Sequence, residues 1–206
     1  MYPLGVGGNR DIVPGMSTEA ANAGRLRARA LFRRWPTVAG LAFAAGYVFR
    51  ITTGLEPAPI LVAALVIYLG TAALGRPGAA WPLFFAAAAV IVLTRAALPG
   101  VQPSWVLFAL GVPLLGYGLA RRAFRPLWGL PLQTLLFAVV GGLAAIGPLL
   151  GAETGGLLIA AGLLAHAALD VHLLRTGRLV PRSMAEFCVV LDTALAVAIT
   201  AVVAPN

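Results

Sequence analysis

Seven long apolar stretches limit the fold of this chain more than any other feature. Short segments rich in Gly, Pro and Arg separate them, and they run over approximately 37–53, 58–74, 80–97, 104–120, 132–149, 155–174 and 185–203. A bilayer core needs about 20 apolar residues in a helix. Only 11% of the residues are charged, against roughly 25% in soluble domains. The sequence therefore excludes a soluble globular, disordered or disulfide-rich protein and predicts an all-α, polytopic membrane protein with seven transmembrane helices.

The net charge of +8 suggests nucleic acid as a partner, but membrane topology explains it better. If the N-terminus is cytoplasmic, only Arg50 and Arg95 of the fifteen basic residues fall on the outer side. The other thirteen are Arg10, Arg25, Arg27, Arg29, Arg33, Arg34, Arg76, Arg121, Arg122, Arg125, Arg175, Arg178 and Arg182. We therefore expect an N-in/C-out protein in a bacterial inner (plasma) membrane, with the lipid bilayer and no nucleic acid as its partner.

The composition changes along the chain and predicts three parts. Residues 1–24 are rich in Gly and Asn without an apolar period, which is typical of a disordered tail. Residues 25–35 carry five arginines among apolar residues, which predicts a basic helix at the membrane interface. Residues 36–206 form the transmembrane domain.

A weak internal similarity raises the hypothesis of a parallel 3+1+3 repeat. Glu56 begins the segment EPAPILVAAL, and Glu153 begins ETGGLLIAAG before the sixth apolar stretch. Chance similarity between Ala- and Leu-rich helices is the favoured explanation of this match.

Ionisable residues gather in the last two apolar stretches. Such residues are rare inside membranes and usually functional. Both histidines of the chain, His166 and His172, lie within seven positions that also contain Asp170. Asp192 lies at a depth similar to that of His166, and the short connection predicts antiparallel neighbours. We therefore expect His166, Asp170 and Asp192 to form a deep cluster, with His172 and Glu186 nearer the cytoplasmic surface.

Three roles compete for this cluster. A histidine beside a carboxylate is a usual pair for acid/base chemistry or proton relay. His166, Asp170 and Asp192 also suit a divalent metal, although their spacing matches no known ligand motif. The third role is an interhelical clamp without chemistry. The single cysteine, Cys188, excludes an internal disulfide or a cysteine-based metal cluster.

Other candidates for substrate contact are fewer and less specific. Tyr47 and Arg50 lie one turn apart near the outer side, where Arg50 binds an anionic group, extends to the interface or pairs with Glu56 or Glu153. Tyr68 and Tyr117 can donate into a central cavity, but tyrosines in apolar helices are ordinarily packing residues.

The scarcity of polar side chains in the apolar stretches narrows the substrate class. A hydrophilic substrate would find few hydrogen-bonding partners there. The leading hypothesis is an integral membrane enzyme that acts on a lipid-like or isoprenoid substrate through His166, Asp170 and Asp192. The alternatives are a small proton- or ion-coupled transporter and a non-catalytic membrane subunit or scaffold.

Overall fold

A computed structural model of the chain describes residues 34–204. The predicted tail and almost all of the predicted interfacial helix lie outside this range. Residues up to Trp35 belong to a separate unit, so the description below concerns the transmembrane unit that begins at Pro36. The described residues contain no strand, which confirms the all-α class.

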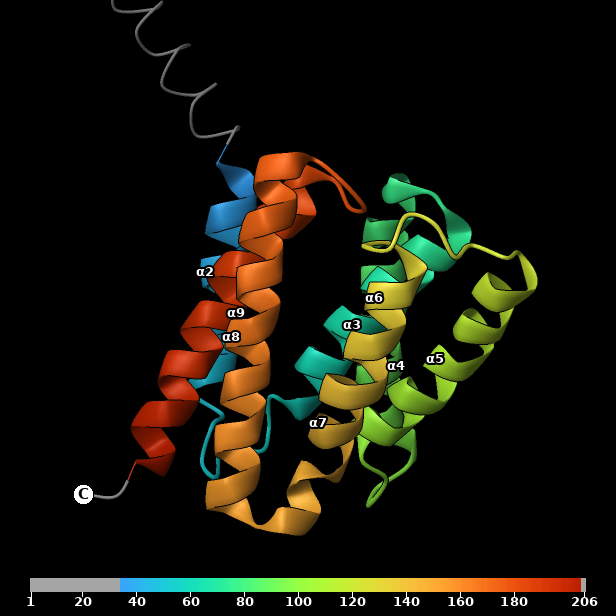
Figure 1. Cartoon of the computed structure of the whole chain (residues 1–206). Helices are drawn as coiled ribbons and strands as arrows, with labels where there is room; N and C mark the ends of the chain where they lie inside the picture. Colours follow the sequence, from blue (N-terminus) through green and yellow to red (C-terminus); the bar gives the residue numbers. More distant parts are fainter. Residues whose placement is uncertain (1–33, 205–206) are drawn as a thin grey trace, which may run out of the picture. The chain divides into compact units, whose positions relative to one another are not determined.

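Between residues 34 and 204, seven helical segments follow one another (Figure 1). They are α2 (Trp35–Val48), α3 (Ala58–Leu74), α4 (Ala80–Ala97) with the short turn η1 (Pro77–Ala79) before it, α5 (Pro103–Ala120), a composite segment, α8 (Ala152–Thr176) and α9 (Arg182–Val203). The composite segment joins α6 (Leu130–Leu136), the π-helical η2 (Phe137–Gly141), α7 (Gly142–Ile146) and η3 (Gly147–Leu150). Five of the seven segments are long and apolar enough to cross a membrane, whereas α2 and α3 are shorter. The coordinates thus agree with a multi-pass membrane protein.

The first helix is shorter than the sequence predicts. It ends at Val48 rather than near residue 53, because the chain turns between α2 and α3. Gly54 has a φ of +79° in this turn, which favours glycine. The Glu56 carboxylate also accepts hydrogen bonds from the backbone N–H groups of Thr52 and Thr53, which keeps both residues out of the helix.

Helix α3 is the centre of the described structure. Every residue from Ala58 to Ala73 is buried, and α3 contacts α4, α5, α6, α7 and α8. Helix α4 is also predominantly apolar, with Arg95 in its last turn, but buries only Ala80, Ala87 and Thr94. Hydropathy does not separate these two cases, because lipid and protein interior are equally apolar. The central position of α3 brings its single tyrosine, Tyr68, into the protein interior.

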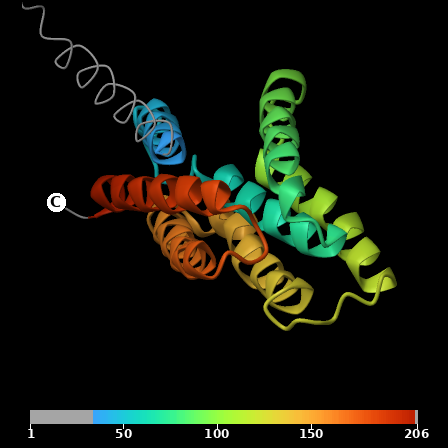
Figure 2. The same cartoon turned by 90° about the horizontal axis from the view of Figure 1, so that it is seen from above.

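Helices α8 and α9 form the predicted antiparallel hairpin and the most extensive helix pair (Figures 1 and 2). Gly177 ends α8 in a left-handed conformation, with its N–H on the Leu173 carbonyl, and Pro181 precedes α9. Each helix buries a stripe at three- and four-residue spacing. His166 and Asp170 belong to the stripe of α8, and Asp192 belongs to the stripe of α9.

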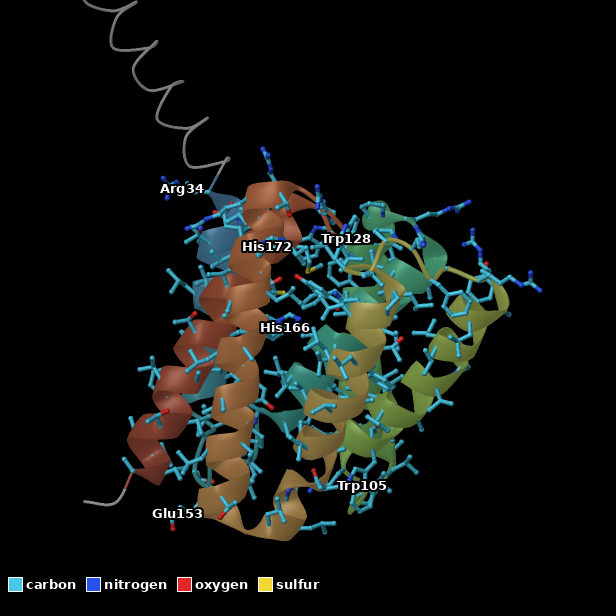
Figure 3. The ribbon with its side chains drawn as sticks, viewed as in Figure 1. Arg34, Trp105, Trp128, Glu153, His166 and His172 are labelled. Atoms are coloured by element: carbon cyan, nitrogen blue, oxygen red, sulfur yellow. The ribbon has the colours of Figure 1, made fainter. Side chains whose placement is uncertain are left out.

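Most arginines of the transmembrane unit lie at one end of its helices. We call this the arginine-rich end; it comprises the segment before α4, the segment between α5 and α6, and the turn between α8 and α9. It carries Arg76, Arg121, Arg122, Arg125, Arg175, Arg178 and Arg182. Trp128 also lies at this end, whereas Trp105 and Glu153 lie at the opposite end (Figure 3).

Candidate functional site

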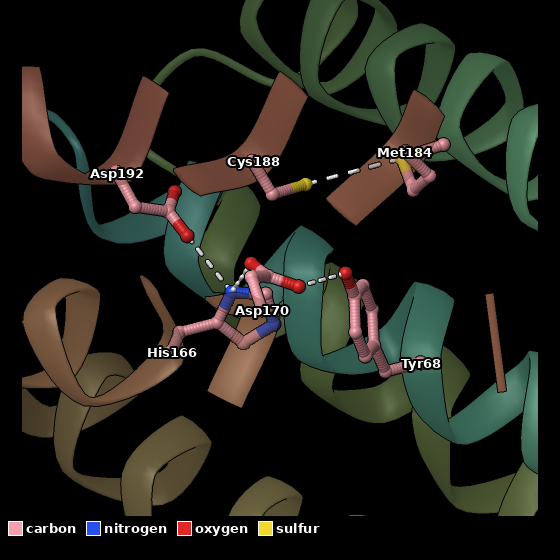
Figure 4. Close-up of polar contacts among 6 residues, drawn as sticks. All are labelled: Tyr68, His166, Asp170, Met184, Cys188 and Asp192. Carbon is pink, nitrogen blue, oxygen red and sulfur yellow. Dashed lines mark hydrogen bonds and ion pairs between the residues drawn. The ribbon is translucent and has the colours of Figure 1, made fainter. Parts of the chain in front are cut away.

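The three residues predicted to form a deep cluster meet in the structure (Figure 4). His166 Nδ1 lies 2.8 Å from Asp192 Oδ2 and 3.1 Å from Asp170 Oδ2. His166 and Asp170 are one turn apart on α8, and Asp192 faces them from α9. His166 and Asp192 meet because they lie equally far from the turn that joins the two antiparallel helices. His166 lies ten positions before Thr176, the last residue of α8, and Asp192 lies ten positions after Arg182, the first residue of α9. Both are therefore about 15 Å from the arginine-rich end.

Tyr68 is a fourth member of the cluster. Its hydroxyl donates a hydrogen bond to Asp170 Oδ1, and its ring meets the His166 ring edge-on with 4.7 Å between centroids. The sequence favours a packing role for Tyr68 and does not show that α3 lies in the protein interior. A buried tyrosine hydroxyl ordinarily needs a hydrogen-bond partner, and here Asp170 is that partner.

The cluster is buried but not saturated with hydrogen bonds. His166, Asp170, Asp192 and Tyr68 are each at most 3% exposed. Nδ1 carries at most one hydrogen and bonds Asp192, so Asp170 Oδ2 has no hydrogen bond of its own. His166 Nε2 and Asp192 Oδ1 also lack partners. Buried polar atoms are usually paired. Glu56, Ser104, Gln133 and Thr134 each have one such atom without a partner, whereas this cluster gathers three around one imidazole, which marks it as a candidate functional site.

Two kinds of chemistry are open to these atoms. With ionised carboxylates, His166 Nδ1 holds the hydrogen and Nε2 is free to accept one, which is the arrangement of an acid/base pair. Alternatively, the ligand atoms of His166, Asp170 and Asp192 all lie within 4.8 Å of one another. Three such donors can hold a divalent metal and leave a coordination position open.

A small apolar cavity has Asp192 in its wall. Its free volume is about 40 Å³, and α2, α3, α4 and α9 supply its walls. Phe43, which is 44% exposed, lines it together with Phe84 and Phe187. Asp192 is the one lining residue with a carboxylate. Cys188 is also in the wall, with its thiol 3.9 Å from the Met184 sulfur.

The two residues predicted nearer the surface do not join the cluster. His172 is exposed, and no hydrogen bond or ion pair joins it to Glu186 within residues 34–204. Glu186 instead accepts a hydrogen bond from Thr37 of α2. The sequence does not predict the contact with Thr37, because spacing gives the depth of Glu186 but not the position of α2 beside α9.

Tyr47, Arg50 and Tyr117 lie away from the cluster. The Tyr47 hydroxyl donates to the Glu56 carbonyl at 2.6 Å and accepts from Arg95 at 2.9 Å. Arg50 is exposed and lines a shallow hollow with Tyr47, without the predicted ion pair to Glu56 or Glu153. Tyr117 is 48% exposed and lies under the Arg121 guanidinium, so it does not reach a central cavity.

The Glu56 carboxylate is held in the turn between α2 and α3. Burial alone would raise its pKa, but the Thr52 hydroxyl and the backbone N–H groups of Thr52 and Thr53 donate to the carboxylate and bring the pKa below its usual value. Glu56 therefore stabilises a turn and takes no part in the cluster.

Comparison with protein-family models, with curated proteins and with solved structures found no match for this chain.

Proposed function

We propose that this protein is an integral membrane enzyme that performs acid/base chemistry on a lipid-like substrate. The observation that carries the proposal is the apolar cavity lined by Asp192, whose carboxylate is hydrogen-bonded to His166. Because the cavity wall is almost wholly apolar, a hydrocarbon chain is the chemistry that suits it. A hydrocarbon-bearing substrate such as a lipid or an isoprenoid would enter between α2 and α4 as Phe43 and Phe84 rotate.

In this proposal the four residues have different roles. Asp192 is the group that reaches the cavity and therefore the substrate. His166 exchanges a proton with Asp192 across their 2.8 Å hydrogen bond. Asp170 lies 3.1 Å from the same nitrogen and orients the imidazole, while the Tyr68 hydroxyl fixes Asp170.

The cavity also bears on the alternative functions. A transporter needs access to its site from both sides of the membrane, and a cavity of about 40 Å³ is too small to provide it. A scaffold needs no buried group of an imidazole and two carboxylates, which His166, Asp170 and Asp192 form here. These features favour an enzyme over the transporter and scaffold hypotheses.

The proposed orientation follows from the charges. With the arginine-rich end in the cytoplasm, the cluster lies about 15 Å from the cytoplasmic ends of α8 and α9, and the protein resides in a bacterial inner membrane. Seven crossings are part of this proposal, with α2 and α3 as short spans; the 3+1+3 repeat remains a prediction. An active cytoplasmic reporter fused to the C-terminus would contradict this topology.

The enzyme hypothesis is tested by lipid turnover. Purified protein in nanodiscs is incubated with a bacterial lipid extract, and consumed and formed lipids are identified by mass spectrometry. Blocking the cavity with Ala88→Leu should abolish turnover. The neighbouring Ala89→Leu is the control, because Ala89 is exposed and does not line the cavity. Equal turnover by both variants would show that the cavity does not hold the substrate.

A further inference from the structure

A second cavity lies at the arginine-rich end and takes no part in the proposed reaction. It has a free volume of about 220 Å³ and lies between the end of α3 and the segment that joins α5 to α6. Arg76 and Arg125 line it, together with the indole of Trp128. Its floor includes Thr71, whose hydroxyl already donates to the Ile67 carbonyl. The cavity thus combines apolar walls with two guanidinium groups.

Positive charge at this cavity has no acidic counterpart. The guanidinium of a third residue, Arg178, lies 5.4 Å from the centre of the Trp128 ring. Within residues 34–204, the side chains of Arg76, Arg125 and Arg178 form no hydrogen bond or ion pair. None of the five described acids lines the cavity; they are Glu56, Glu153, Asp170, Glu186 and Asp192. These guanidinium groups therefore have their donors available for an anion.

Stabilisation of a helix end does not explain these arginines. Cationic side chains near a helix C-terminus interact favourably with its last carbonyl groups. At the end of α3, however, Gly75 caps the helix with its backbone N–H, and Arg121 donates to the Leu74 carbonyl at 2.9 Å. The helix end is already satisfied, so Arg76 and Arg125 remain uncommitted.

The wall of the cavity also contains an unusual backbone conformation. Leu179 is 8% exposed and has a φ of +66°, which is costly for a residue with a branched side chain. Such conformations persist where the surrounding structure imposes them, and they are common at ligand sites. Here the conformation places Leu179 in the wall of the cavity.

We propose that this cavity binds the phosphate headgroup of an anionic membrane lipid. Guanidinium groups bind phosphate oxygens through paired, charge-assisted hydrogen bonds. Basic pockets between membrane helices are suited to lipid headgroups, and the apolar walls accept the adjoining glycerol and upper chain. We call it the headgroup pocket. It does not depend on the proposed reaction, because it shares no lining residue with the cavity at Asp192.

The test measures binding of dioctanoyl phosphatidate to the full chain in neutral detergent at low ionic strength. Tryptophan fluorescence reports binding because Trp128 lines the pocket, and Trp128→Phe verifies the source of the signal. The test variant is Arg76→Gln with Arg125→Gln. The control is Arg175→Gln with Arg182→Gln, which removes equal charge from the same end without touching the pocket. Thermal unfolding without lipid verifies that both variants fold.

We expect the pocket variant to bind phosphatidate at least about tenfold more weakly, because each lost charge-assisted hydrogen bond weakens binding substantially. The control and Asp192→Asn should bind within about twofold of the wild type. Equal weakening in the pocket variant and the control would overturn the proposal, since it would indicate general attraction to charge. Dioctanoylglycerol, which lacks phosphate, should not bind. Competition by inorganic phosphate at equal concentration would also overturn it, because the ligand would then be a free anion.

Discussion

The Glu56 carboxylate and the cluster of His166, Asp170 and Asp192 differ in the number of hydrogen-bond donors around them. Oε1 of Glu56 accepts hydrogen bonds from the backbone and hydroxyl groups of Thr52 and Thr53, and Oε2 is the one oxygen of this carboxylate without a partner. The cluster of His166, Asp170 and Asp192 is at most 3% exposed, yet three of its polar atoms have no hydrogen-bond partner.

The difference separates a structural role from a chemical one. A carboxylate with several local donors stabilises the turn that contains it. An unpaired buried polar atom costs about 1–3 kcal/mol, so the arrangement at His166 does not serve stability alone. We therefore expect changes at Glu56 to affect folding and changes at the cluster to affect activity.

Replacing Asp192 should have the largest effect on activity. Asp192→Asn keeps the shape of the side chain but removes a proton-accepting group, so lipid turnover should fall by roughly 10²–10⁴-fold. The double variant His166→Gln with Asp192→Asn should be equally inactive and still fold, as judged by thermal unfolding in detergent. A folded, fully active double variant would show that the pair only holds α8 and α9 together, a contact worth about 0.6 kcal/mol.

Tyr68→Phe should reduce activity by a smaller factor, of about tenfold, because Asp170 loses its hydroxyl donor while Asp192 and His166 remain. The loss should appear mainly in kcat, since Tyr68 does not line the substrate cavity. Tyr117→Phe is the matched control on an exposed tyrosine. Equal activity of the two variants would exclude Tyr68 from the positioning of Asp170.

Glu56→Gln should lower the midpoint of thermal unfolding by a few degrees at neutral pH and leave turnover unchanged. The pKa of Glu56 is lowered in the folded protein, so its ionised form stabilises the fold above the unfolded pKa of about 4.3. This stabilisation is lost as the pH falls through the lowered folded value. The wild-type midpoint should thus approach that of the variant in acid. A difference that is constant from neutral pH down to about pH 3 would contradict this explanation.

Removing divalent metals should change activity least. In the acid/base mechanism, dialysis against a chelator leaves turnover unchanged, and elemental analysis finds no stoichiometric metal. If activity instead disappears with the chelator and returns with zinc or manganese, His166, Asp170 and Asp192 act as metal ligands. Asp192→Asn should then also lose the metal.

The fold class and the central contact of the site could be predicted from the sequence. Apolar length predicts helices, because backbone groups in a membrane must be paired within the segment. The short connection after α8 predicts an antiparallel neighbour, and equal distance from that connection predicts that His166 and Asp192 meet. These are local properties of one hairpin, and residue spacing determines them.

Only the tertiary structure decided which helix is central, which tyrosine reaches the cluster and where the cavities lie. Helices α3 and α4 are both predominantly apolar, but α3 is buried on all sides and almost all of α4 is exposed or half-buried. Tyr68 therefore bonds Asp170, whereas Tyr117 lies on the surface. Hydropathy measures transfer out of water, and it is the same for a side chain that faces lipid and for one that faces protein. Contacts between helices that are distant in sequence depend on whether each helix face meets lipid or another helix. The spacing of residues along the chain does not determine this.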